Sequence, residues 1–169
     1  MMNFSIEAHI PSDFNDHARV WIFQSSRLFS MSEAFEIETI LKDHCSGWKS
    51  HGHAVKGYAN LFFGQFIVVM ADETEATVGG CSTDSLFRII KQIEALRKVN
   101  LFDRQMLAFL VKDKIQLLPL AQIKYAVSNG HISPTTIYFN NTVGTKKELM
   151  QNWMIPMNES WLAARVSQA

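Results

Sequence analysis

The residue of this sequence whose type and position are best suited to chemistry is Cys81. It lies in the stretch TVGGCSTDSLF, residues 77–87, directly after a glycine pair and at the start of an amphipathic helical pattern. A thiol at a helix N-terminus is stabilised as the thiolate by the partial positive charge of the free N–H groups. With His51 or His53 as a general base, Cys81 would be the nucleophile of a thiol-dependent enzyme.

The same loop is also suited to bind an anion or another small-molecule ligand. Glycine leaves the backbone N–H groups of residues 79–83 accessible, and Arg19 would add a positive charge. Asp84 counts against the nucleophile, because a carboxylate in the first turn offsets the field that a thiolate needs. The candidate ligand-binding residues are Gly79, Gly80, Ser82, Thr83, Asp84 and Arg19.

A metal site is a third interpretation of these residues. His51 and His53 stand two residues apart at the start of a predicted strand, so both imidazoles can point the same way. Asp72 or Cys81 would complete the set of ligands. The spacing is weak evidence, since a His-x-His pair also arises by chance, and we expect neither a metal nor a cofactor.

A purely structural role is the simplest interpretation of the loop. The glycine pair at 79–80 would form a tight turn between a strand and a helix. Ser82, Thr83 or Asp84 would be the N-cap of that helix, and Cys81 would be a small buried residue.

The hydrophobic pattern predicts the elements that position these residues. Residues 19–25 and 66–71 are apolar on both faces, as central strands are, whereas residues 55–63 alternate as an edge strand does. A capping box at Ser30 and Glu33 begins a first helix, and a second begins near Thr83. With a strand at 106–111, the order is that of an α+β fold with a ferredoxin-like split β-α-β-β-α-β core, a largely antiparallel sheet and helices packed on one face.

The C-terminal part predicts an extension of this sheet by one or two strands. Residues 106–111 (MLAFLV) are apolar on both faces although the fourth strand of the core should be an edge. Residues 115–118 can pair beside them, and 136–139 can add another strand. Helices are expected at 119–127 and after a capping box that begins at Thr145.

The split topology predicts which candidate residues meet. The third strand runs opposite to the first two, so its end lies beside their starts. One edge of the sheet should therefore hold Asp72, the loop 79–84, the His51–His53 segment and Arg19. This placement depends on a hairpin that brings residues 51–53 next to residues 79–84.

Length and composition indicate one domain, 1–169, with an irregular N-terminal segment (1–18) and a C-terminal tail (154–169). Sixteen Lys and Arg residues balance sixteen Asp and Glu residues, so we expect no nucleic-acid partner and no membrane partner. The sequence shows no signal peptide or transmembrane pattern. Two cysteines without CxxC spacing indicate reduced thiols in a soluble cytoplasmic protein, with Cys45 in the core.

Catalytic motifs with strong signals are missing from the sequence. There is no G-x-x-x-x-G-K-[ST], G-x-G-x-x-G, H-E-x-x-H or G-x-S-x-G. The first of these absences argues against a P-loop ATPase.

Several segments together resemble a small uncharacterised bacterial protein family, whose members are often labelled automatically "ABC transporter ATPase". These segments are RVWIFQ (19–24), HG (51–52), FIVV with DE (66–73), GCSTD (80–84), FNN (139–141) and SW (160–161). The resemblance covers most of the chain from Arg19 onward. It implies no catalytic residues, and the missing lysine loop contradicts the label.

Two functional classes follow from these observations. The first is a non-catalytic ligand-binding or assembly module, which could form a homodimer through an exposed sheet face or edge. The second is an enzyme that uses Cys81 with His51 or His53.

Overall fold

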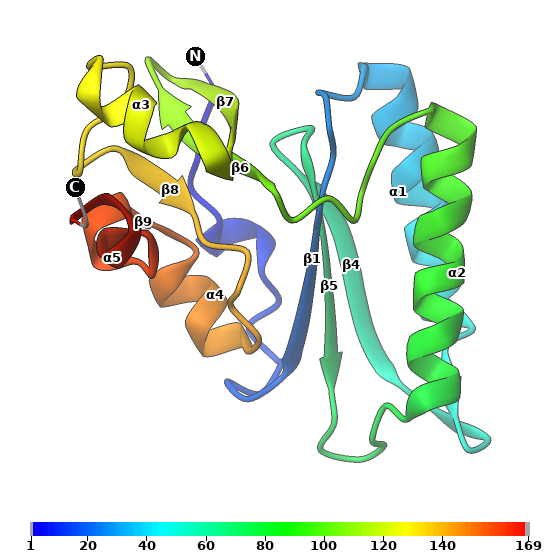
Figure 1. Ribbon diagram of the computed structural model, residues 1–169. Coiled ribbons are helices and arrows are strands. Elements are labelled where there is room, and N and C mark those ends of the chain that lie inside the picture. Colours follow the sequence, from blue (N-terminus) through cyan, green and yellow to red (C-terminus); the bar gives the residue numbers. More distant parts are fainter. Residues whose placement is uncertain (1, 168–169) are drawn as a thin grey trace.

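The computed structural model describes residues 2–167 and shows an α+β protein with antiparallel sheets (Figure 1). The first half contains η1 (Glu7–His9), β1 (Arg19–Gln24), α1 (Met31–Ser46), β2 (Lys49–Ser50), β3 (His53–Ala54), β4 (Lys56–Phe62), β5 (Phe66–Asp72) and α2 (Gly80–Arg97). The second half contains β6 (Met106–Val111), β7 (Lys114–Pro119), η2 (Leu120–Gln122), α3 (Ile123–Ser128), β8 (Ile137–Phe139), α4 (Lys146–Asn152), β9 (Met154–Pro156), η3 (Met157–Glu159) and α5 (Leu162–Ser167).

The central strand of the first sheet is β5. The strand order is β1-β5-β4, and β5 runs antiparallel to both neighbours. All seven of its residues are buried, because successive side chains alternate between two cores. Ile67 and Val69 pack with residues of α1 and α2, whereas Val68 and Met70 pack against the second half of the chain. Both long helices therefore cover one face of this sheet, as predicted (Figure 1).

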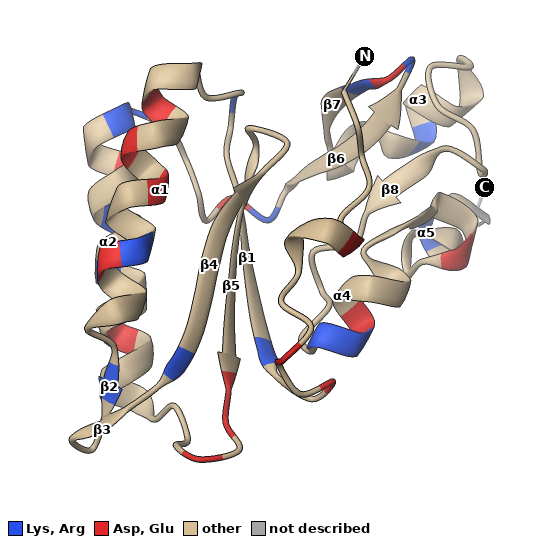
Figure 2. Cartoon of the chain, turned by 180° about the vertical axis from the view of Figure 1, so that it is seen from behind, with Lys and Arg blue, Asp and Glu red and all other residues tan. Residues whose placement is uncertain are grey.

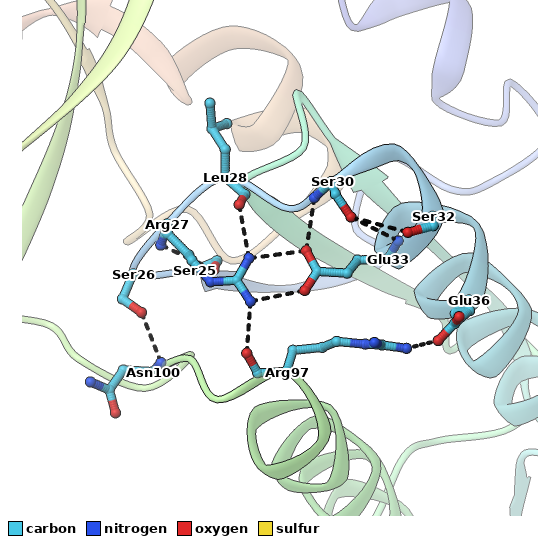
Figure 3. A network of polar contacts seen from close by, with 10 residues as sticks. All are labelled: Ser25, Ser26, Arg27, Leu28, Ser30, Ser32, Glu33, Glu36, Arg97 and Asn100. Atoms are coloured by element: carbon cyan, nitrogen blue, oxygen red, sulfur yellow. Dashed lines mark hydrogen bonds and ion pairs between the residues drawn. The ribbon is translucent and has the colours of Figure 1, made fainter.

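A network of polar contacts joins the first turn of α1 to the last turn of α2 (Figure 3). Arg27 donates to both carboxylate oxygens of Glu33, at 3.0 and 2.9 Å, and to the main-chain oxygen of Arg97 at 2.7 Å. Ser30 and Glu33 form the predicted capping box. A further ion pair links Arg97 to Glu36. These contacts fix the two helices to each other at one end of the layer.

The predicted fourth strand, β6, belongs to a second sheet. The strand pairing therefore does not show the ferredoxin-like arrangement, in which all four strands would lie in a single sheet. The second sheet has the order β7-β6-β8-β9. β6 lies between β7 and β8, which explains why MLAFLV is apolar on both faces. The segment beside β1 comes from further along the chain: the Val20 N–H donates to Gly144 O at 3.0 Å, and Arg19 forms a bridge with Thr145.

A shared core joins the two halves. Phe66 of β5 packs edge-to-face against the fully buried Trp153, with ring centroids 5.2 Å apart. The N-terminal segment closes one side of this core, since Ile6, Ile10 and Phe14 are buried and Lys146 donates to the main-chain oxygens of Pro11 and Phe14. The segment expected as a C-terminal tail, 154–169, contains β9, η3 and α5 up to Ser167.

Charged residues of both signs lie on α2 and α4, whereas the charged residues of α1 are mostly acidic (Figure 2). Among residues 2–167, no helix has the length and apolar character needed to cross a bilayer.

Candidate functional site

The N-terminus of α2 opens into a pocket of about 720 Å³, which we call the α2 pocket. The end of α1 and the β2–β3 hairpin form its other walls. Two hydrogen bonds hold these elements together: Trp48 Nε1 donates to Ser82 O at 3.0 Å, and Ser82 Oγ donates to Lys49 O at 2.9 Å. The lining residues are Asp43, His44, Gly47, Trp48, Lys49, Ser50, His51, Gly79, Gly80, Cys81, Ser82 and Ser85.

The first turn of α2 has no side-chain cap. Gly79 is the N-cap, with extended backbone angles (φ −87°, ψ −171°) and no side-chain hydrogen bond. The expectation of a cap at Ser82, Thr83 or Asp84 was wrong, because the helix begins earlier: Thr83 donates through its N–H and its Oγ1 to Gly79 O. The first N–H groups of a helix have no partner within it, and a Cβ added at Gly80 would meet nothing within 4 Å. Gly80 and Cys81 are exposed at this end, whereas Ser82 is buried.

Cys81 is exposed at this helix end, so the expectation of a small buried residue was wrong. Its thiol makes no hydrogen bond with any residue between 2 and 167, and the structure shows no thiol–imidazole pair. Asp84 is exposed and lies beyond the first turn, which contains no acidic residue. Cys45, which was expected in the core, is only partly buried, and burial raises the pKa of its thiol to about 11.

The histidine candidates separate in the structure. His51 has a left-handed backbone (φ 50°) in the turn of the β2–β3 hairpin, and its Nε2 lies 3.5 Å from where a Cβ on Gly79 would be. His53 is exposed in β3, opposite Ser50, and does not line the α2 pocket. The structure therefore places one of the two imidazoles beside the α2 N-terminus.

Arg19 and Asp72 also lie away from the α2 pocket. The guanidinium of Arg19 stacks over Trp21 at 4.7 Å and pairs with Glu73 at 3.7 Å. Asp72 accepts hydrogen bonds from the Asn15 N–H at 2.8 Å and from Thr74, and these bonds, with that of Thr74 first, lower the pKa of its carboxyl. Among the described residues no cluster of three His, Cys, Asp or Glu side chains could hold a metal ion.

Two pocket residues that the sequence analysis missed carry buried polar atoms without a partner. Ser50 is 4% exposed, and neither its Oγ nor Nε2 of His44 has a hydrogen-bond partner among the described residues. Burial lowers the pKa of the His44 imidazole, whose ring lies 5.0 Å from that of Trp48. His44 falls one turn after Leu41 on the apolar stripe of α1, and a histidine on such a stripe is the signal that could have revealed it.

This arrangement can bind a negatively charged group. It combines helix N–H donors without a side-chain cap, an unpartnered hydroxyl and an imidazole at the mouth, in a volume typical of small-molecule pockets. Comparison of the chain with protein-family models, curated proteins and solved structures found no match. The functional argument therefore depends on the geometry of the site.

Proposed function

We propose that this protein is a small-ligand-binding module that holds an oxyanion, such as a phosphate group, at the N-terminus of α2. One observation carries the proposal: a helix end without a side-chain cap opens into a pocket whose wall contains the buried, unpartnered hydroxyl of Ser50. Buried hydroxyls are normally hydrogen-bonded, because leaving one unpaired costs about 1–3 kcal/mol. A ligand oxygen at the α2 end would supply the missing partner.

The charges around the α2 pocket agree with this ligand class. α2 is an 18-residue helix, so its first turn has the positive end of a full macrodipole. Lys49 and His51 are exposed at the mouth, and Asp43 is the acidic residue among the described residues that line the pocket. The N–H groups of Gly80, Cys81 and Ser82 would bind the oxyanion, while His51 would contact the rest of the ligand.

The test is a pair of substitutions at Gly80, with phosphate as the probe. Gly80→Pro removes one N–H donor at the first helical position, where proline is well tolerated and where the extended backbone of Gly79 suits a following proline. Gly80→Ala keeps the donor, and its Cβ has open space. We expect phosphate to shift the amide signals of residues 79–82 in NMR spectra and to bind about tenfold more weakly to the proline variant than to the alanine variant. Equal affinity of the two variants, or shifts elsewhere only, would overturn the proposal.

Thiol chemistry is a second candidate, since Cys81 is exposed and shares the α2 pocket with His51. Iodoacetamide at neutral pH should modify Cys81 far faster than Cys45, whose thiol is half-buried with a pKa of about 11. Because access alone would produce that difference, the decisive comparison is the rate at Cys81 in the His51→Gln variant. A rate unchanged by that substitution would rule out His51 as the base.

We further propose that residues 19–111 are a variant of the split β-α-β-β-α-β unit and that the chain belongs to the bacterial family it resembles. The order β1-β5-β4 with two helices on one face supports the first statement, and the displaced β6 is the departure from that unit.

A further inference from the structure

A second pocket, of about 160 Å³, lies where the two halves of the molecule meet; we call it the seam pocket. Its walls come from the end of β1, the connection before β6, the end of β8 with the loop that follows it, and Trp161 near the C-terminus. It is smaller and more enclosed than the α2 pocket and shares no residue with it. Any ligand here would be independent of the proposed oxyanion.

The interior amides of the seam pocket are already paired. Asn141 Nδ2 donates to Gln24 Oε1 at 3.0 Å, Gln24 Nε2 donates to Met106 O at 3.0 Å, and Trp153 Nε1 donates to Asn141 Oδ1 at 3.0 Å. This chain of bonds joins β1 to the second sheet. Because these side chains already form hydrogen bonds with one another, a ligand would be recognised by the other groups that surround the pocket.

Among the residues that the structure describes around this pocket, those groups are aromatic rings and the guanidinium of Arg104. Phe102 and Trp161 line the seam pocket and are each 39% exposed. Tyr138 lies behind them, with its ring centroid 6.3 Å from that of Trp161. Arg104 is exposed and makes no hydrogen bond or ion pair with any residue in the described range. The neighbouring Asp103 accepts the Gln105 N–H at 2.8 Å and so serves as a turn cap.

We propose that the seam pocket binds a single-ring aromatic carboxylate, with the ring against Phe102, Tyr138 and Trp161 and the carboxylate at Arg104. The volume fits one ring, since an apolar cavity of about 150 Å³ in another protein holds benzene. A guanidinium is the side chain best suited to pair with a carboxylate, because its parallel N–H donors match the two oxygens. Burial raises the pKa of Tyr138 to about 12, so its phenol stays neutral and does not repel the anion.

Benzoate is the probe, and the Arg104→Gln variant is compared with Arg88→Gln, which removes an exposed arginine of α2 outside the seam pocket. We expect saturable shifts of the Phe102, Thr142 and Trp161 amides and of the Trp161 indole N–H. Arg104→Gln should weaken benzoate binding by about tenfold, or ~1.4 kcal/mol, while Arg88→Gln leaves it unchanged. Benzyl alcohol and acetate, which each lack one half of the probe, should bind more weakly than benzoate.

Several results would overturn this proposal. They are an absence of saturation, equal loss in the two arginine variants, equal binding of benzyl alcohol, and shifts confined to residues 79–82. The same titration in saturating phosphate separates the two pockets, because benzoate should bind the seam pocket unchanged. Failure of the phosphate experiment with success of this one would reject the proposed oxyanion site alone.

Discussion

The indole Nε1 of Trp48 donates a hydrogen bond to the main-chain oxygen of Ser82 across 3.0 Å. Trp48 is 3% exposed, and it joins the end of α1 to the first turn of α2. The position of the α2 N-terminus, and therefore of its free N–H donors, depends on this contact.

Replacing Trp48 with phenylalanine tests this dependence. Trp48→Phe removes the donor and reduces the buried ring, while Ser82 O keeps the hydrogen bond from Ser85 Oγ at 2.9 Å. We expect a loss of about 2 kcal/mol in the free energy of unfolding and weaker phosphate binding. Chemical denaturation measures the first and calorimetric titration the second. Trp161→Phe changes a partly exposed tryptophan outside the α2 pocket. It should have smaller effects on both the free energy of unfolding and the phosphate affinity.

The unpartnered hydroxyl of Ser50 predicts a stabilising substitution. Ser50→Ala removes a buried Oγ that has no hydrogen-bond partner, so the free energy of unfolding without ligand should rise by about 1 kcal/mol. The matched control is Ser82→Ala, which removes an equally buried hydroxyl that does donate, to Lys49 O. That variant should lose about 1 kcal/mol instead.

With phosphate bound, the wild type should become more stable than Ser50→Ala, because the Ser50 hydroxyl then gains a hydrogen-bond partner from the ligand. Thermal unfolding of both proteins with and without phosphate gives the comparison. A Ser50→Ala variant that is less stable than wild type without ligand would show that this hydroxyl is satisfied in the free protein.

The long elements of the first half were predictable because their patterns are local. The alternation of residues 55–63 and the continuous apolar run of 66–71 match an edge strand and a strand with two cores. The neighbour of β1 was not predictable in this way. A pattern shows that a strand is buried but not by what, and the segment at 144–145 lies more than a hundred residues from β1.

Pro156 is the last residue of β9, an edge strand, where the missing N–H of proline is tolerated.

The candidate site was predictable in its location but not in its chemistry. Antiparallel pairing places the turn at His51 and the loop at Gly79 on the same edge of the sheet, and the structure has them in contact distance. Side-chain capping rules pointed to Ser82, Thr83 and Asp84, whereas the helix begins at an uncapped glycine. The unpartnered Oγ of Ser50 depends on the packing of two distant segments, which no local pattern reports.

Gly57 of β4 should tolerate no side chain. A Cβ at this position would lie 2.8 Å from the Trp48 ring. Gly57→Ala should therefore move the indole and lower the free energy of unfolding by about 2 kcal/mol. Gly144→Ala, where a Cβ would meet nothing within 4 Å, should be neutral or slightly stabilising. Similar stability of the two variants would show that the indole shifts without cost.

The ion pair of Arg27 with Glu33 predicts a pH-dependent contribution to stability. Arg27, followed by hydrogen bonding from Ser30, lowers the pKa of the Glu33 carboxyl from 4.5 to about 2. Because this pKa is lower in the folded state, the ion pair contributes fully to the free energy of unfolding at pH values above the ordinary pKa of 4.5. The contribution is lost as the pH falls from 4.5 toward about 2.

Glu33→Gln should accordingly destabilise the protein at neutral pH and have a progressively smaller effect toward about pH 3. Denaturant unfolding of the variant and the wild type at several pH values measures the difference. Glu159→Gln, at an exposed carboxylate with no ion pair to any described residue, is the control and should show no such trend. An effect of Glu33→Gln that stays constant over this range would mean that the capping geometry, rather than the charge on Glu33, stabilises the start of α1.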